Sequence, residues 1–402
     1  MIPQLYNKAT LMLIAGEVSG DHHGERLVRE LSALQPDLQF VGIGGTGMRD
    51  AGVKLLHTID ELAVLGLVEV IKNYPAIRSI FFDCVRYARK YKPSAVILID
   101  YPGFNIRFAK QMKKIGIPVI YYISPQVWAW GRHRRKTISK RVDKMLVFFD
   151  FEKDFYTDTG LDVTFIGHPL VETVDPQMDK TTFLRANGLQ QTKPVVGLLP
   201  GSRKNEIINI LPIMIEAAYL LSLKRPDIQF VLPIGQSVPS DKIDEILQNT
   251  HRDKIKQLRL APRQVHETMA YSDMVMIASG TATLETACFA TPMAIIYKVN
   301  FITYLLARML IRIPYIGLVN VVAGRKIIPE FIQHEACPSA IAESVLKHID
   351  NPQLMADKRH ELKQIRQKLG KPGAVKRAAL EIISFLAVSC KTTATKPEQT
   401  VS

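Results

Sequence analysis

Two short loops in the second half of the sequence carry residue types that bind phosphate. The segments Pro200–Arg203 and Ser279–Glu285 each follow a short apolar run directly. Small-residue turns between a strand and a helix point backbone N–H groups at an anion. Two such loops together with Arg203 favour a nucleotide diphosphate site, with Glu285 as a partner for ribose hydroxyls. The alternative is a pair of ordinary strand-to-helix connections.

A carboxylate in the first half is the candidate general base. Asp100 closes the apolar run Ala95–Ile99, and the chain then leaves the expected sheet through Tyr101–Asn105. A carboxylate at the tip of a central strand lies where parallel sheets bind ligands, and partial burial raises its pKa toward a useful range. The alternative is an aspartate that only caps a helix or closes a turn.

A glycine turn follows the first expected strand. Gly16–Asp21 is not a G-x-G-x-x-G motif, and no acidic residue ends a second strand about 20 positions on, so a dinucleotide cofactor is not expected. A glycine turn at the end of a strand is instead a candidate loop for an acceptor substrate. In the alternative interpretation the turn is purely structural, and Asp21 caps the next helix.

Both tryptophans of the chain lie in Ser124–Gly131, and the basic run Arg132–Lys136 follows at once. Aromatic side chains beside cations can stack on a sugar, lie at a membrane interface or bind phosphate. One tryptophan could equally fill the core. His168-Pro169 farther along is interpreted as a hinge between domains.

These residues need parallel sheets to position them, and the pattern of apolar runs predicts two. Short apolar runs alternate with amphipathic segments, which is typical of parallel sheets covered on both faces. The expected strands are Leu11–Ala15, Gln39–Ile43, Ala95–Ile99, Val119–Ile123, Lys144–Phe148, Val163–Ile166, Val195–Leu199, Gln229–Leu232, Gln257–Leu260, Met274–Ile277 and Met293–Ile296. The expected helices are Asp21–Leu34, Ile77–Lys90, Arg107–Ile115, Arg134–Lys140, Glu206–Leu223, Lys242–Asn249, Val265–Ala270, Thr283–Phe289, Pro338–Ile349, Pro352–Leu369 and Ala374–Val388.

The fold class is therefore α/β, with two doubly wound Rossmann-like domains and an active site in the cleft between them. We predict an acceptor-binding domain over residues 1–170 and a donor-binding domain over 171–350. C-terminal helices over 351–390 pack back on the first domain or exchange with a second copy, and 391–402 is a disordered tail.

The composition of the chain limits the classes of molecule that it is expected to bind. The chain has 402 residues, 47% of them hydrophobic, and a net charge of +14. Such a charge fits nucleic acid, an anionic membrane surface or an acidic substrate. No nucleic-acid motif is present, so a membrane surface or a phosphorylated substrate is favoured. The four cysteines are scattered without a CxxC pair, which favours neither a zinc ribbon nor a disulfide framework and fits a reducing cytoplasm.

Two stretches are lipophilic, and metal motifs are lacking. Leu62–Ile71 with Phe81-Phe82, and Phe301–Val319, can form core helices, contact a membrane or wall an acyl-chain pocket. The sequence contains neither HExxH nor Asp-x-Asp, so we expect no metal and no other cofactor. Arg203, backbone amides and a helix N-terminus are then left to offset the diphosphate charge.

Seven segments taken together resemble the lipid-A-disaccharide synthase family. They occur in consistent order between residues 16 and 325: Gly16–Asp21, Asp100–Asn105, Ser124–Gly131, Gly167–Pro169, Pro200–Arg203, Ser279–Glu285 and Asn320–Arg325. The set is specific, although no single motif would suffice. Val18, within Gly16–Asp21, stands where the family more often has a smaller residue, and this conservative difference does not change the resemblance.

The resemblance implies a metal-independent, inverting glycosyltransferase of the GT-B type. It implies transfer of 2,3-diacylglucosamine from UDP to the 6-hydroxyl of 2,3-diacylglucosamine 1-phosphate, in the cytoplasm at the inner membrane, by a protein that forms dimers with exchanged C-terminal helices. Asp100 and Arg203 are the expected catalytic residues. The expected UDP contacts are Gly201, Ser202, Arg203, Ser279, Gly280, Thr281, Glu285 and Asn320, and the expected acceptor contacts are Glu17, Ser19, Asp21, Asn105, Trp128 and Arg132.

Two other functions compete with this one. A UDP-N-acetylglucosamine 2-epimerase uses a similar two-domain scaffold, but it needs neither a wide apolar surface nor the tryptophan and basic cluster. A non-enzymatic basic membrane protein would explain the charge but not the paired phosphate loops.

Overall fold

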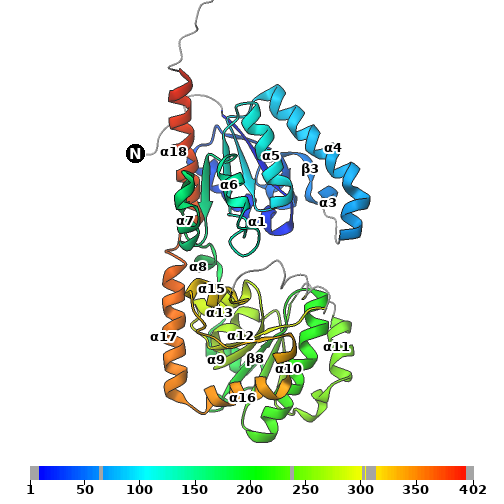
Figure 1. Ribbon diagram of the computed structural model, residues 1–402. Coiled ribbons are helices and arrows are strands. Elements are labelled where there is room, and N and C mark those ends of the chain that lie inside the picture. The colour runs from blue at the N-terminus through cyan, green and yellow to red at the C-terminus, as the bar shows by residue number, and fades with distance from the viewer. Residues whose placement is uncertain (1–8, 63–66, 236–239, 301–303, 305–313, 395–402) are drawn as a thin grey trace, which may run out of the picture. The chain divides into compact units, whose positions relative to one another are not determined.

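The computed structural model describes residues 9–62, 67–235, 240–300, 304 and 314–394, and they form two compact α/β units (Figure 1). Unit 1 comprises residues 1–169 and 371–402, and unit 2 comprises residues 170–370. Each unit contains one parallel sheet with helices packed on it. The predicted class, two doubly wound α/β domains, is confirmed.

The sheet of unit 1 has seven strands in the order β3-β2-β1-β4-β5-β6-β7. Its strands are β1 (Thr10–Ala15), β2 (Gln39–Gly44), β3 (Val53–Thr58), β4 (Ala95–Ile99), β5 (Val119–Tyr122), β6 (Lys144–Val147) and β7 (Asp162–Phe165). Its helices are α1 (Val18–Leu34), α2 (Thr46–Asp50), α3 (Ile59–Leu62), α4 (Leu67–Tyr91), α5 (Pro102–Lys114), α6 (Arg134–Ser139), α7 (Phe151–Tyr156) and α18 (Ala374–Ala394).

The sheet of unit 2 has six strands in the order β10-β9-β8-β11-β12-β13. Its strands are β8 (Val195–Leu199), β9 (Gln229–Ile234), β10 (Leu258–Pro262), β11 (Met274–Ala278), β12 (Met293–Tyr297) and β13 (Glu330–Ile332). Its helices are α8 (Leu170–Thr173), α9 (Lys180–Ala186), α10 (Lys204–Lys224), α11 (Ser240–Gln248), α12 (Val265–Tyr271), α13 (Ala282–Cys288), α15 (Leu318–Ala323), α16 (Pro338–Ile349) and α17 (Pro352–Lys368).

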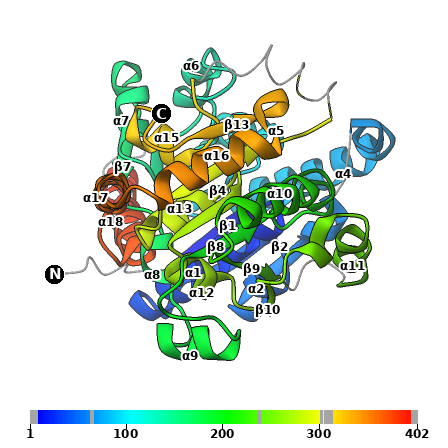
Figure 2. The same cartoon turned by 90° about the horizontal axis from the view of Figure 1, so that it is seen from below.

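Alternation along the strands of unit 2 explains why both faces are covered. Val196 and Leu198 of β8 join one core with α10 and α16, which lie side by side in Figure 2. Val195, which precedes Val196 in the strand, packs on the opposite face with Phe183 of α9. Side chains that point alternately to two buried faces make a strand apolar throughout, as the sequence of β8 is.

Helix α10 is also long and apolar enough to span a membrane, but half of it is buried. Its side chains Ile210, Met214 and Ala218 belong to the core of unit 2. We therefore describe α10 as a core helix.

The C-terminal helices divide between the units, which differs from the predicted boundaries. Helix α17 stays with unit 2, where Arg359 donates to the Asp273 carbonyl (3.2 Å) and Arg366 to the Cys288 carbonyl (3.1 Å). Helix α18 belongs to unit 1, where it packs against α1. The buried Lys144 of β6 anchors α18 through an ion pair of 2.9 Å with Glu381, and it forms a second ion pair of 2.9 Å with Asp162 of β7.

In each sheet the chain first builds strands to one side and then crosses to the other. The strand order changes direction between β1 and β4 in unit 1 and between β8 and β11 in unit 2. Ala15 pairs with Ile99, and Leu199 pairs with Ile277. Open α/β sheets bind ligands beyond the carboxyl ends of the strands at such a switch point. The four loops singled out in the sequence therefore flank the two switch points, two loops at each.

Candidate active site

Asp100 stands at the switch point of unit 1 in an unusual backbone conformation. Asp100 and Tyr101 both have a φ of 45°, in the left-handed region that residues other than glycine rarely adopt. Two such residues in succession cost on the order of 1–3 kcal/mol each, so the surrounding structure must hold them there. Strain of this kind collects at functional sites.

Side chains from two elements hold the Asp100 backbone in place. The Asp100 carbonyl accepts hydrogen bonds from the Tyr121 hydroxyl (2.6 Å) and from Asn105 Nδ2 (2.8 Å). Asn105 Nδ2 also donates to the Ile99 carbonyl (3.2 Å), and Asn105 is fully buried. The structure thus gives Asn105, expected as an acceptor contact, a positioning role beneath Asp100. Helix α5 accordingly begins at Pro102, five residues before the predicted start at Arg107.

The first glycine turn packs directly on this strained loop. A Cβ atom on Gly16 would lie 2.2 Å from Cδ1 of Tyr101, so only glycine fits beneath that ring. Burial, and to a smaller extent the negative charge of Glu17, raise the pKa of Asp100 to about 6, although the hydrogen bond from the Tyr101 amide opposes both effects. The site therefore holds a carboxyl whose pKa is tuned for proton transfer near neutral pH.

The remaining residues of the glycine turn divide between surface and core. Glu17 and Ser19 are exposed at the start of α1. Asp21 is buried inside α1 and accepts backbone hydrogen bonds from Gly45 (2.6 Å), Gly47 (3.0 Å) and Met48 (3.0 Å). The expectation that Asp21 caps its own helix is therefore wrong, because its carboxylate caps α2 instead. Its predicted contact with an acceptor would have to compete with these three amides.

Trp128 is also committed to the protein. It is 7% exposed, its indole N–H donates to Glu152 Oε1 (3.2 Å), and its ring meets Phe151 edge-on. Burial raises the pKa of Glu152 to about 8, although its hydrogen bonds with Phe149 and Trp128 oppose the shift. Trp128 thus anchors the loop after β5 to α7, whereas Arg132 at the end of that loop is exposed.

His168, next to the boundary between the units, and His23 are both neutral near pH 7. Burial lowers the pKa of His168 to about 3, with a contribution from the charge of His23, and burial lowers the pKa of His23 to about 4. Both rings pack on Phe148. The boundary between the units falls between Pro169 and Leu170, next to the residues interpreted as a hinge.

In unit 2, the first loop predicted to bind phosphate, Pro200–Arg203, already binds a carboxylate of the protein itself. Glu206 Oε2 accepts from the amides of Ser202 (3.2 Å) and Arg203 (3.3 Å), and its Oε1 pairs with Arg203 Nη1 (2.9 Å). Gly201 has a φ of 111°, and a Cβ there would lie 2.4 Å from the Glu206 carboxylate. The loop amides do converge on negative charge, as the sequence suggests, but that charge belongs to the third residue of α10.

Glu206 is not among the residues predicted for the site, although its position carries a signal in the sequence. A glutamate three residues after the N-cap is the mark of a capping box. Arg203 at the N-cap is 83% exposed even with this pairing, so its guanidinium is available to a ligand.

The second loop of unit 2 is more open. A Cβ on Gly280 would meet nothing within 4 Å, and Thr281 precedes α13 without a side-chain cap. The Ser279 hydroxyl donates to the Ile316 carbonyl (3.3 Å). Glu285 lies in the first turn of α13, 3.7 Å from His266 Nε2, and this contact raises the pKa of His266. His266 is a second residue that the sequence did not single out.

Asn320 is not open to solvent. It is fully buried, and its Nδ2 donates to Ile328 O (2.9 Å) and Glu330 Oε1 (2.8 Å). Its Oδ1 accepts from the amides of Ile327 (2.9 Å) and Ile328 (3.0 Å). With both donors and both acceptor positions used, Asn320 fixes the loop after α15, and a direct contact with UDP would break this network.

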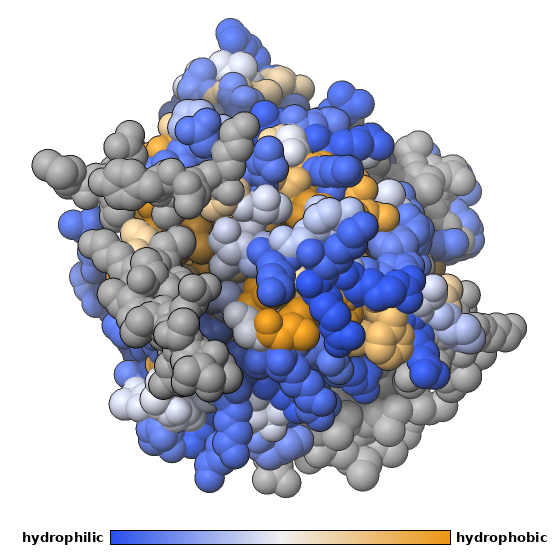
Figure 3. Space-filling model, turned by 90° about the horizontal axis from the view of Figure 1, so that it is seen from above, coloured by the Kyte–Doolittle hydropathy of each residue, from blue (hydrophilic) through white to orange (hydrophobic). Residues whose placement is uncertain are grey.

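The lipophilic stretches lie largely outside the described residues. Residues 63–66 and 305–313 are not described, so the predicted acyl-chain or membrane contacts stay predictions. On the face shown in Figure 3, the apolar patches are small and separated by hydrophilic side chains. Within the described ranges, no group of three or more His, Cys, Asp or Glu side chains could hold a metal.

Comparison with known proteins identifies relatives over nearly the whole chain. The lipid-A-disaccharide synthetase family model matches residues 11–383. A lipid-A-disaccharide synthase of Syntrophus aciditrophicus is 40% identical over 380 residues, covering 94% of this chain and 98% of that protein. A lipid-A-disaccharide synthase of Geobacter metallireducens is 42% identical over 376 residues, covering 94% and 97%.

Solved structures support the fold. A putative UDP-N-acetylglucosamine 2-epimerase from Listeria monocytogenes superposes with a TM-score of 0.62 at 12% identity, covering 98% of this chain and 100% of that one. At this identity the likeness concerns the scaffold alone.

Proposed function

The chain belongs to the lipid-A-disaccharide synthase family, a family of glycosyltransferases, and we propose that it transfers 2,3-diacylglucosamine from UDP to the 6-hydroxyl of 2,3-diacylglucosamine 1-phosphate. The products are the β-1,6-linked disaccharide 1-phosphate and UDP. Beyond family membership, one observation carries the proposal: a strained, partly buried Asp100 with a pKa of about 6 ends the central strand of unit 1.

We assign the acceptor half of the reaction to unit 1. Asp100 in its carboxylate form removes the proton of the acceptor hydroxyl as that oxygen attacks the anomeric carbon. A positioned base contributes about 10²–10⁴-fold to such a step. Attack on the side opposite the leaving UDP inverts the anomeric centre. Glu17 keeps the pKa of Asp100 high, so the base accepts a proton readily once it is ionised.

We assign the donor half to unit 2. Departure of UDP places negative charge on the β-phosphate, and the exposed Arg203 guanidinium with the amides of Ser202 and Gly280 supplies donors for it. Glu206 accepts hydrogen bonds from the Ser202 amide and the Arg203 guanidinium in the described structure, so the diphosphate must replace its carboxylate at these two donors. Glu285, which lies 3.7 Å from His266 Nε2, is the proposed acceptor of hydrogen bonds from the ribose hydroxyls.

We also propose that the protein works in the cytoplasm, peripherally bound to the inner membrane, and that it forms a dimer through exchange of C-terminal helices. The net charge of +14 suits an anionic membrane surface, and acylated substrates reside in one. Helix α18 is the candidate for exchange because it contacts the rest of unit 1 after a connection at Lys371.

Incubation of the purified protein with UDP-2,3-diacylglucosamine and 2,3-diacylglucosamine 1-phosphate in detergent tests the proposal. We expect a disaccharide 1-phosphate whose mass equals that of the two substrates together minus UDP, and release of one UDP per product, measured by mass spectrometry and a coupled UDP assay. The control omits the acceptor. UDP release at the same rate without acceptor, or epimerisation of UDP-N-acetylglucosamine, would contradict the proposal.

A further inference from the structure

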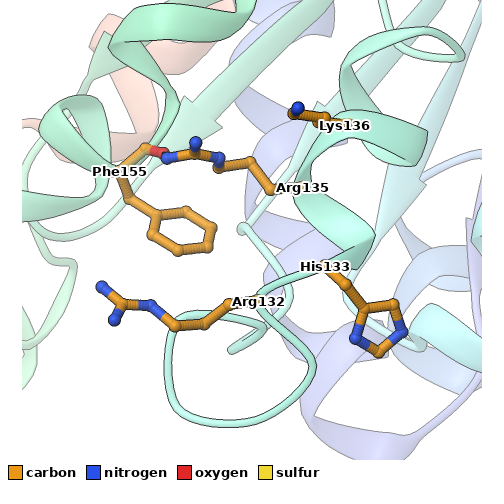
Figure 4. A pocket seen from close by; sticks show the side chains of 5 residues that line it. All are labelled: Arg132, His133, Arg135, Lys136 and Phe155. Carbon is orange, nitrogen blue, oxygen red and sulfur yellow. The ribbon is translucent and has the colours of Figure 1, made fainter.

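A cationic pocket lies in unit 1, and Asp100 is not among the residues that line it. It has a volume of about 490 Å³ and is lined by Arg132, His133, Arg135, Lys136 and Phe155. Figure 4 shows the Phe155 ring between the side chains of Arg132 and Arg135. The two guanidinium carbons lie 5.9 Å and 5.5 Å from the ring centroid. The ring thus supports two like charges that would otherwise repel each other in open solvent.

The positive charge of the pocket is only partly offset. Arg135 donates to the Phe155 carbonyl (2.9 Å) and to Asp158 (2.7 Å). Arg132 and Lys136 are exposed, and neither has a carboxylate partner within the part of the chain that the structure describes. The nearby Glu152 is buried behind Trp128. The pocket therefore offers at least two cations to an anion.

The walls of the pocket are held by the core. Arg132 ends the loop that follows β5, and Phe155 lies on α7, which follows β6. The hydrogen bond from Trp128 to Glu152 ties that loop to α7, and Trp128 packs edge-on against Phe151. The buried tryptophan thus builds the pocket that its basic neighbours line.

The sheet order places this pocket at the same edge as the candidate base. Asp100 follows β4, and β5 and β6 are the next two strands in the sheet. Neighbouring strands are about 5 Å apart, so the ends of β5 and β6 lie roughly 5–10 Å from the end of β4 in the plane of the sheet. The segments that carry Asp100 and the lining of the pocket therefore leave the carboxyl ends of three neighbouring strands.

We propose that this pocket binds a phosphate group on an amphipathic ligand, and, resting on the proposed function, that the group is the 1-phosphate of the acceptor sugar. Guanidinium groups bind phosphate oxygens through paired, charge-assisted hydrogen bonds. The volume exceeds that of one phosphate and leaves room for part of the sugar that carries it. The headgroup of an anionic phospholipid is the other source of the same chemistry.

Binding without catalysis tests the pocket itself. Glucosamine 1-phosphate and glucosamine are titrated calorimetrically into the protein and into Arg132→Gln. We expect the phosphorylated sugar to bind, and its affinity to fall about tenfold in the variant. Lys114→Gln is the matched control, because Lys114 is an exposed cation in the last turn of α5, at the opposite edge of the sheet. Equal binding of both sugars, or equal losses in both variants, would overturn the pocket.

Kinetics and vesicle binding then distinguish the two sources. In Arg132→Gln we expect the KM for the phosphorylated acceptor to rise about tenfold, while the KM for a dephosphorylated acceptor and for the UDP donor stays unchanged. Binding to phosphatidylglycerol vesicles should match that of Lys114→Gln. Loss of vesicle binding with an unchanged acceptor KM would overturn the assignment to the acceptor. If the wild-type protein makes no disaccharide but shows Arg132-dependent sugar-phosphate binding, the proposed reaction fails and the pocket stands.

Discussion

The switch points of the two sheets have the same topology and opposite charge. In unit 1, the loops after β1 and β4 present Glu17 and Asp100, two carboxylates close enough for one to raise the pKa of the other. In unit 2, the loops after β8 and β11 present Arg203 and open backbone amides. The switch point of unit 1 therefore carries proton-accepting carboxylates, whereas the equivalent switch point of unit 2 carries a cation and amide donors. The difference teaches that the residues at the strand ends, and not the doubly wound fold, decide the chemistry.

Replacing the base should produce the largest effect. Asp100→Asn keeps the size of the side chain but removes the proton acceptor, so we expect kcat to fall about 10³-fold. Because unit 2 carries the donor loops, the affinity for UDP should not change. Steady-state kinetics and calorimetric titration with UDP measure the two quantities. A comparable loss of UDP affinity would contradict the division of labour between the units.

Replacing the exposed Arg203 should produce the second-largest effect. Arg203→Ala removes the guanidinium that faces the leaving diphosphate, and we expect kcat/KM for the donor to fall about 100-fold. Lys204→Ala is the control, because Lys204 is an exposed cation one residue farther along in α10 and has no assigned role. Equal losses in both variants would mean that only the net charge of the unit matters.

A variant of Asn320 in unit 2 distinguishes a contact with UDP from a structural role in the loop after α15. Asn320→Ala removes the side-chain partner of the Ile328 carbonyl and of the Ile327 and Ile328 amides, and it removes one of the two donors to Glu330 Oε1. We expect the free energy of unfolding to fall by about 2–4 kcal/mol, measured by urea denaturation. Asn209→Ala, which removes an exposed hydrogen bond to the Asn205 carbonyl, should change it by less than about 0.5 kcal/mol. Unchanged stability with weakened UDP binding would make Asn320 a ligand contact.

The strands that bear the site were predictable because their signal is local. Ala95–Ile99 and Val195–Leu199 are continuous apolar runs, and both strands begin and end as predicted. Strands β3 and β13 were missed, because Val53–Thr58 mixes polar with apolar residues and Glu330–Ile332 is only three residues long. A short or half-buried strand leaves little periodicity to detect.

The roles of individual site residues were less predictable, because their partners are distant in sequence. Asp21 binds amides 24 to 27 residues away, and Trp128 binds a carboxyl 24 residues away. A polar or aromatic side chain in a motif can support the ligand site from behind or touch the ligand. Only the fold reveals which partner satisfies it. Asp100 was the simpler case, since its position follows directly from the strand that it ends.

The smallest effect tests how the two carboxylates of unit 1 are coupled. Only ionised Asp100 accepts a proton, so kcat/KM should rise with pH through about 6 and be lost below it. Glu17→Gln removes the nearby negative charge but not the burial, which is the larger cause. We therefore expect the acid limb to move to lower pH by less than about one pH unit. Asp37→Asn, an exposed carboxyl just after α1 and at the amino edge of the sheet, should leave the limb in place. An acid limb that does not respond to Glu17→Gln would assign the titration to another group, and the carboxylate pair of unit 1 would lose its role in the comparison.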